Sequence, residues 1–213
     1  DGHAVALGGV IVDSGNFDWK NSKFTEFTQP DESYHGVIYT QKFGKMAYIT
    51  KATAQLMRDL GSIQSPQHAF LINVGLETLH LRMPRHCGKC LQGSFLSEIQ
   101  RGCAWVNYPG LEGDKYYELA KKYMPNGTCG VISFGLKSGR EGAARFMDRL
   151  KLCSIETMAD SRTAVLHPAS HTHRQLTNEQ LVEAGVDPSM IRFSVGIEDA
   201  EDIIEDIRQA LED

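Results

Sequence analysis

Apolar positions along the first third of this chain predict one strand and two helices. Residues 5–12 are apolar almost throughout and rich in valine and isoleucine, which predicts a strand buried on both faces. A helix is expected over residues 40–60, where Gly61 then breaks the pattern. Ser65-Pro66 supplies an N-cap and a first-turn proline, so a second helix is expected to begin there.

The second predicted helix is unusually long. Apolar side chains keep roughly helical spacing from Pro66 to Leu91. A helix of this length usually joins domains rather than lying inside one. Because Pro84 falls within it, we expect a kink near Met83.

After Gly102 short apolar runs and amphipathic segments interleave. Strands are predicted near residues 104–106, 129–136, 152–155, 163–166 and 191–195, and helices near 114–123, 141–150 and 199–211. This spacing is typical of an α/β domain with a mainly antiparallel sheet.

The segment from Asn16 to Gly36 is polar yet rich in rings. It holds five aromatic side chains, too many for a solvated loop: Phe17, Trp19, Phe24, Phe27 and Tyr34. We therefore expect an ordered lid or interface element in which these rings are buried.

Composition narrows the classes of partner. The 213 residues carry a net charge of −5 and no basic stripe, which argues against a nucleic-acid partner. No apolar run approaches the roughly 20 residues needed to span a bilayer, so no membrane partner is expected. Five cysteines are an odd number and predict no disulfide framework, which favours a cytoplasmic protein.

Two clusters have the residue types of metal sites but not their spacing. Cys87 and Cys90 form a CxxC beside His86, yet no second pair of ligands follows at a suitable distance. The histidines of residues 167–173 lie around Pro168 in a predicted loop. No metal is expected at either place.

Several motifs, in the right order, resemble those of the Cys/Met-metabolism family of pyridoxal-phosphate enzymes. The most specific is the C-terminal run from Ile191 to Asp199. Gly2-His3 with Gly8-Gly9 resembles the stretch just after the family's cofactor lysine. The other matching segments are residues 65–87, 106–111 and 167–173.

The resemblance implies the α/β fold of a fold-type I, aspartate-aminotransferase-like enzyme with pyridoxal 5'-phosphate as cofactor. Residues 1–60 would be the C-terminal part of the large cofactor domain, and 61–213 the long linking helix and C-terminal substrate domain. The Schiff-base lysine would precede Asp1 by three residues, so no catalytic residue is assigned within the chain. Gly2 and His3 would lie near the cofactor, with His3 in a structural role.

Within the family, residues 13–36 and 172–176 resemble O-acetylhomoserine sulfhydrylases. This implies a homotetrameric enzyme of methionine biosynthesis that replaces acetate by a sulfur nucleophile, giving homocysteine or methionine. The partners would be O-acetylhomoserine, a sulfur donor (sulfide, methanethiol or a protein thiocarboxylate) and the N-terminal remainder of the enzyme. The alternatives are a cystathionine γ-synthase, a methionine or cystathionine γ-lyase, and a non-catalytic fragment or subunit that lacks the lysine.

Arg192 and Thr157 are the candidate substrate-binding residues. Arg192 lies in a short apolar strand, so its charge should be buried or half-buried and should need a partner. An internal ion pair with Glu198 or Asp199 is one reading. The resemblance implies the other, a two-pronged clamp on the substrate α-carboxylate. It also implies that Thr157 assists the clamp, although Ala159 stands where the family usually has glycine.

Overall fold

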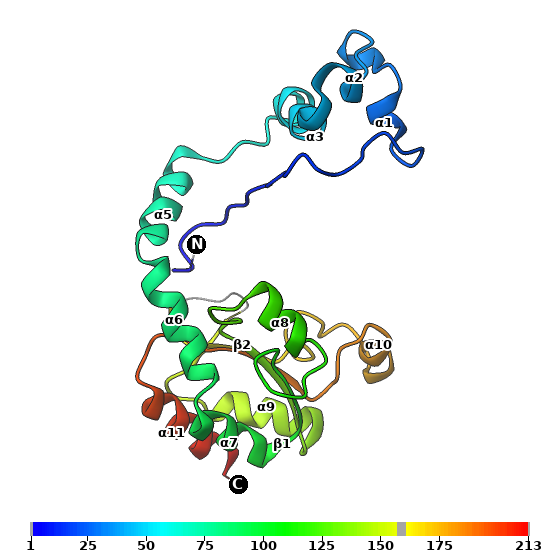
Figure 1. Cartoon of the computed structure of the whole chain (residues 1–213). Coiled ribbons are helices and arrows are strands. Elements are labelled where there is room, and N and C mark those ends of the chain that lie inside the picture. Colours follow the sequence, from blue (N-terminus) through cyan, green and yellow to red (C-terminus); the bar gives the residue numbers. More distant parts are fainter. Residues whose placement is uncertain (1, 157–160, 213) are drawn as a thin grey trace. The chain divides into compact units, whose positions relative to one another are not determined.

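The computed structural model describes residues 2–156 and 161–212 and divides the chain into two compact units. The helical unit is Leu7–Phe70, and the sheet unit is Asp1–Ala6 together with Leu71–Asp213. Figure 1 shows the sheet unit built around strands and the other unit built from short helices. Each unit is described by itself.

The sheet unit has one five-stranded sheet in the order β1-β2-β5-β4-β3. All neighbouring strands run antiparallel except β3 and β4, which confirms the predicted mainly antiparallel sheet. The strands are β1 (Cys103–Asn107), β2 (Val131–Leu136), β3 (Ser154–Ile155), β4 (Ala164–Leu166) and β5 (Met190–Ser194). The predicted strands lie within one to two residues of these bounds at most ends.

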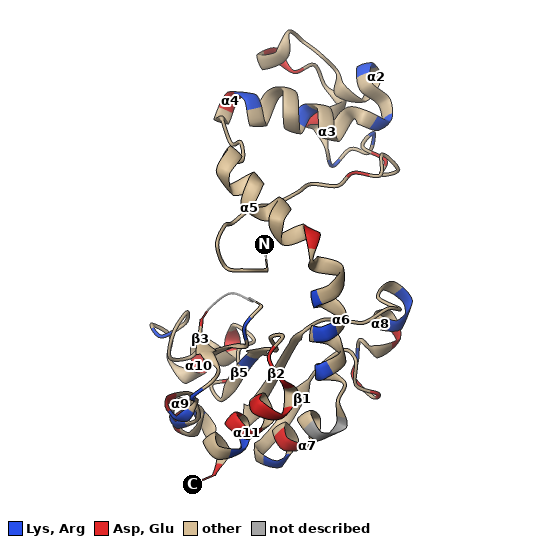
Figure 2. Ribbon diagram, turned by 90° about the vertical axis from the view of Figure 1, so that its left-hand side faces the viewer, with Lys and Arg blue, Asp and Glu red and all other residues tan. Residues whose placement is uncertain are grey.

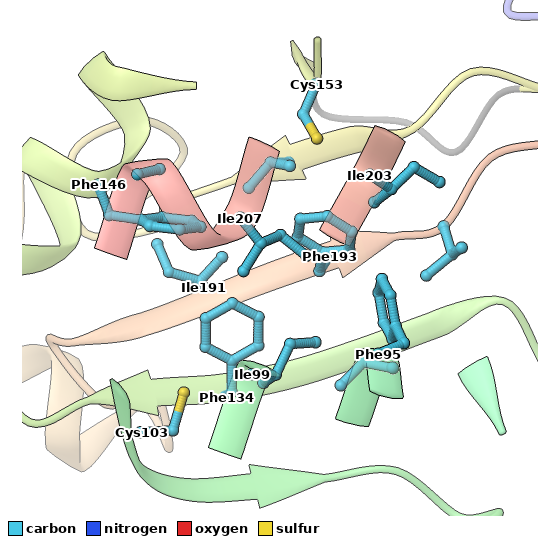
Figure 3. Packing of buried hydrophobic residues seen from close by; sticks show 14 of the residues in the cluster. Phe95, Ile99, Cys103, Phe134, Phe146, Cys153, Ile191, Phe193, Ile203 and Ile207 are labelled. Atoms are coloured by element: carbon cyan, nitrogen blue, oxygen red, sulfur yellow. The ribbon is translucent and has the colours of Figure 1, made fainter. Parts of the chain in front are cut away.

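One face of the sheet packs against three amphipathic helices, α7 (Gly93–Gly102), α9 (Gly139–Arg149) and α11 (Ala200–Leu211). Alternate strand residues such as Phe134, Ile191 and Phe193 point into this core and meet Ile203 and Ile207 of α11 (Figure 3). Each fully buried side chain of this size stabilises the fold by about 1.5–3 kcal/mol. Two short helices complete the unit, α8 (Tyr117–Tyr123) and α10 (Asn178–Glu183).

The long predicted helix is divided in two at Thr78, not near Met83. α5 spans Pro66–Glu77, and α6 (Leu79–Cys90) continues through Pro84. Pro84 removes only the hydrogen bond to the carbonyl of His80, in the first turn of α6. At the break, Thr78 is held by Arg82, which donates from its backbone N to Thr78 O (3.0 Å) and from Nε to Thr78 Oγ1 (3.1 Å).

The expected buried strand over residues 5–12 is wrong. These residues form no regular secondary structure, and Val10 and Val12 are 85% and 86% exposed. A strand needs a hydrogen-bonding neighbour, and among the described residues none of the strands pairs with this segment. Residues 5–12 thus have the composition of a buried strand, but no described strand or helix buries them.

The helix expected over residues 40–60 is interrupted near its start. α2 (Tyr39–Phe43) ends at Gly44, whose φ of 53° lies outside the α-helical range, and Gly44–Met46 forms a 3₁₀ turn. A helical run then continues from Ala47 to Leu60 through α3 (Ala47–Lys51), a π-helical turn (Ala52–Met57) and α4 (Arg58–Leu60). It ends at Gly61, where the sequence predicts the pattern to break, and Gly61 has the left-handed φ of 66°.

Aromatic rings hold the rest of the helical unit together. Trp19 stacks on Tyr48 with ring centroids 4.9 Å apart, and Phe27 and Tyr39 are buried beneath them. The short helix α1 (Thr25–Thr28) carries Phe27 into the cluster. The expected burial of the five rings is confirmed only in part: Phe27 is buried, Trp19, Phe24 and Tyr34 are half-buried, and Phe17 is exposed. That the segment is a lid or interface element stays a prediction.

Candidate active site

Arg192 lies on the face of the sheet opposite the helix-covered core. The register places Arg192 of β5 beside Ser133 of β2 and Leu166 of β4, with Asn107 of β1 beyond Ser133. Paired residues share a face, so these four side chains form a row across the sheet. Arg192 is half-buried, as predicted, while its neighbours Ile191 and Phe193 are buried on the core side.

The two acids considered as internal partners of Arg192 bind other groups. The carboxylate of Glu198 accepts hydrogen bonds from Thr163 N (2.6 Å) and Thr163 Oγ1 (2.9 Å). Asp199 accepts from Glu201 N (3.0 Å) and so caps the first turn of α11. Both carboxylates therefore have structural functions at the end of β5.

Basic side chains of α6 hold the segment that follows β5. Figure 2 shows lysine and arginine recurring along this helix. His86 Nδ1 donates to Val195 O (2.5 Å), and Lys89 Nζ donates to Gly196 O (3.0 Å) and to Glu198 O. Burial lowers the pKa of Lys89, because its ammonium is held away from water.

This buried basic row is not among the features predicted from the sequence, although a signal was present. Arg82, His86 and Lys89 follow the i, i+4, i+7 spacing at which an amphipathic helix carries its apolar side chains. All three are buried. Basic residues at buried spacing indicate that the facing surface offers backbone carbonyls or acids.

Arg82 also reaches the start of the chain. Its Nη2 donates to Gly75 O (2.5 Å) and its Nη1 to Gly2 O (3.5 Å). Gly2 has φ 71°, a backbone conformation that side chains rarely adopt, and a Cβ at this position would displace the guanidinium. His3, which follows, is exposed. The structure thus places Gly2 and His3 beside α6.

The loop after β4 is rigid and buried at its base. His167 is fully buried, donates from Nε2 to Pro188 O (2.9 Å) and accepts at Nδ1 from Ser170 Oγ (2.8 Å). Burial lowers the pKa of His167, which keeps the ring neutral. Arg140 of α9 donates to Ala169 O (2.7 Å) and fixes the turn. These contacts give His167 a structural function.

The remaining candidates differ in how far the structure describes them. Thr157 lies outside the described residues.

Within the described parts of the chain, no group of three His, Cys, Asp or Glu side chains could hold a metal ion. Cys87 and Cys90 are free, buried thiols, and burial raises the pKa of Cys90 to about 12, so it is a poor nucleophile. None of the described helices is long and apolar enough to cross a bilayer.

The helical unit contains an open apolar pocket of about 790 Å³. One wall is the extended segment around Val10 and Ile11, and the other is the helical run that carries Leu56 and Leu60. All four residues are more than half exposed. Exposed apolar patches of this kind mark surfaces that contact proteins, membranes or ligands.

Known proteins match this sequence over nearly the whole chain. A family model described as "Cys/Met metabolism PLP-dependent enzyme" matches residues 1–212. The O-acetyl-L-homoserine sulfhydrylase of Leptospira meyeri is 44% identical over 220 residues, which cover 99% of this chain and 50% of that protein. The homocysteine synthase of Schizosaccharomyces pombe is 46% identical over 214 residues, with the same coverage. The chain therefore spans about half the length of the curated relatives it matches.

Two solved structures are also similar to this chain. A Campylobacter jejuni protein described as an O-acetylhomoserine (thiol)-lyase, solved with a pyridoxyl-lysine monophosphate, matches with a TM-score of 0.76 and 35% identity. The match covers 91% of this chain and 46% of that one. O-acetylhomoserine sulfhydrylase of Wolinella succinogenes matches with a TM-score of 0.68 and 31% identity, covering 93% of this chain and 50% of that one.

Proposed function

Because this chain belongs to the Cys/Met metabolism family of PLP-dependent enzymes, we propose that it forms part of an O-acetylhomoserine sulfhydrylase. In the proposed reaction a carbon–sulfur bond forms at the γ-carbon of O-acetylhomoserine as the carbon–oxygen bond to acetate breaks. Sulfide gives homocysteine, and methanethiol gives methionine. The free thiols of the chain suit a reducing cytoplasm.

One observation carries the proposed substrate site, the half-buried Arg192 on the side of the sheet away from the core. A guanidinium offers parallel donors that match both oxygens of a carboxylate. Clamping the α-carboxylate fixes the substrate about its α-carbon, so that the bond to be broken can be aligned. We assign the clamp to Arg192 and, on the motif alone, a supporting contact to Thr157.

Pyridoxal phosphate, when bound, supplies an electron sink for negative charge that develops on the substrate carbons. The described residues fit a supporting role toward this cofactor. Arg82 donates to the carbonyl of Gly2, and the positive φ of Gly2 favours glycine at this position. We propose that this contact fixes the turn that Gly2 and His3 contribute beside the cofactor, with its lysine outside the chain.

The apolar pocket of the helical unit supports a proposal about the rest of the enzyme. We assign residues 1–60 to the large cofactor domain and 61–213 to the linking helix and substrate domain. The relatives are about twice as long as the matched region. We propose that a polypeptide corresponding to their unmatched half covers the pocket and pairs with residues 8–12, whose two apolar faces suit a central strand. The complex, here called the assembled enzyme, would form a homotetramer.

The test is sulfide-dependent consumption of O-acetylhomoserine by the assembled enzyme. A sulfhydrylase forms homocysteine only when sulfide or another sulfur nucleophile is supplied. Release of a 2-oxo acid without sulfide would indicate a γ-lyase, and cystathionine formed from cysteine would indicate a synthase. An assembled enzyme with none of these activities would leave the chain as a non-catalytic subunit and contradict the proposal.

A further inference from the structure

The four residues after β5 have an unusually complete set of backbone hydrogen bonds. On the N–H side, Val195 donates to Gly130 O (2.7 Å), Gly196 to Thr163 Oγ1 (2.9 Å) and Ile197 to Ser161 O (2.7 Å). These partners come from the end of another strand and from the segment that leads into β4. The end of β5 is therefore tied to residues 161–163.

The carbonyls of the same residues are bound by α6. His86 donates to Val195 O, and Lys89 donates to Gly196 O and Glu198 O. The remaining carbonyl, Ile197 O, accepts from Arg85 Nε (2.9 Å). The segment is thus held from two sides, by basic side chains on its carbonyls and by residues 161–163 on its amides. A backbone held this way cannot shift without breaking several bonds together.

Thr163 is the centre of this arrangement. It is fully buried, its Oγ1 accepts from Gly196 N and donates to Glu198 Oε2 (2.9 Å), and its own N donates to Glu198 Oε1 (2.6 Å). A Cβ on Gly196 would collide with Thr163 N and the Glu198 carboxylate, so the fit requires glycine. One hydroxyl therefore joins the start of β4 to the end of β5.

The proposed clamp residue lies close to this joint along the chain. Arg192 of β5 precedes Val195, the first residue after the strand, by three positions. We infer that Thr163, through Gly196 and Glu198, is a positioning residue for the substrate carboxylate site. The inference rests on the proposed function. A two-pronged clamp requires placement to within roughly 0.5 Å, and the Thr163 joint holds the strand that carries the guanidinium.

The matched variants are Thr163→Val, which keeps the shape of the side chain without the hydroxyl, and Thr163→Ser, which keeps the hydroxyl. The assay compares two ligands of the assembled enzyme: the KM for O-acetyl-L-homoserine and the inhibition constant of its carboxamide, which lacks the carboxylate. In Thr163→Val we expect the KM for the acid to rise about tenfold, with kcat within about twofold and binding of the amide unchanged. Thr163→Ser should stay within about twofold of the wild type.

A purely structural function would weaken both ligands equally or only lower thermal stability, and either result would overturn the inference. If the wild type itself does not prefer the acid over the amide, the Arg192 clamp fails, which separates failure of the proposed function from failure of the inference. If Thr163→Val does not assemble, Glu198→Gln gives the same comparison, with Asp199→Asn as its control.

Hydrogen exchange on the 213-residue chain gives a readout independent of activity. Thr163→Val should speed exchange of the Gly196 amide at least tenfold, and Thr163→Ser should not, because only the valine variant loses the acceptor of that N–H. Unchanged protection of Gly196 in Thr163→Val would show that the hydroxyl does not hold this segment and would overturn the inference.

Discussion

The sheet unit and the helical unit treat their apolar residues in opposite ways. In β5, Ile191 and Phe193 are fully buried against helices of the same unit. In the helical unit the equally apolar Val10 and Val12 are almost entirely exposed, and the buried cluster is a small set of rings around Tyr39. The apolar pattern of a segment therefore predicts the burial that the segment requires. Whether the segment is buried depends on which strands and helices lie beside it.

The largest expected effect breaks the core of the sheet unit. Phe193→Ala should lower the free energy of unfolding by about 3–5 kcal/mol, because it leaves a cavity beneath α11. Val10→Ala should change it by less than about 0.5 kcal/mol, since Val10 is exposed. Urea unfolding of the 213-residue chain measures both effects. Phe193→Ala is followed by Trp105 fluorescence in a Trp19→Phe background, and Val10→Ala by Trp19 fluorescence in a Trp105→Phe background. Similar losses in the two variants would erase the contrast between the units.

The next effect concerns the half-buried charge on the other face of the sheet. Removing one partner of a desolvated charge pair costs on the order of 2–5 kcal/mol, so Arg192→Ala should lower kcat/KM of the assembled enzyme at least about thirtyfold. Arg192→Lys should recover only part of this, because an ammonium cannot reproduce the fork. Cofactor content and thermal stability should stay near those of the wild type. An active but unstable Arg192→Ala would instead support an internal ion pair.

A smaller effect tests the exposed apolar surface. Val10→Asp places a charge in the proposed interface and should weaken association with the companion polypeptide at least about tenfold, or ~1.4 kcal/mol. Val182→Asp, at an exposed apolar position of α10 in the sheet unit, is the matched control. Titration calorimetry measures both. Equal weakening would contradict the interface. If the chain alone forms dimers and Val10→Asp dissociates them, the occupant of the apolar pocket is a second copy of the chain.

The smallest effect separates the two units by pH. Lys51 Nζ lies 2.6 Å from Asp31 Oδ2, and this hydrogen bond is the main reason that the pKa of Asp31 is lowered to about 2. An unfolded aspartate titrates near 3.9, so its stabilising contribution is complete above about pH 4 and is lost as the pH falls toward 2.

Trp19 fluorescence in a Trp105→Phe background reports this loss in the helical unit. Asp31→Asn should remove the pH dependence between 4 and 2, and Asp18→Asn, an exposed control, should retain it. A wild-type transition that does not move with pH in this window would show that the Asp31–Lys51 pair contributes nothing to the unit.

The sequence predicts most of the sheet unit because its signals are local. The alternation around Arg192 places β5 and gives the half-buried arginine, and Asp199 begins α11 as an acidic cap should. The break at Thr78 escapes such reasoning, because Pro84 is the stronger local signal and the contacts of Arg82 are what hold the break. The bond from His86 to Val195 joins residues more than one hundred positions apart, and no period in the sequence encodes it.

The buried ammonium of Lys89 has a practical consequence. It is 7% exposed and lies beneath the backbone that follows β5, held by two carbonyls. Amine-reactive reagents need an accessible, neutral amine, so they can modify Lys89 only after this segment has lifted away from α6. Surface lysines such as Lys121 will react at once. The labelling rate of Lys89 relative to Lys121, measured by mass spectrometry, therefore reports how often the segment after β5 separates from α6.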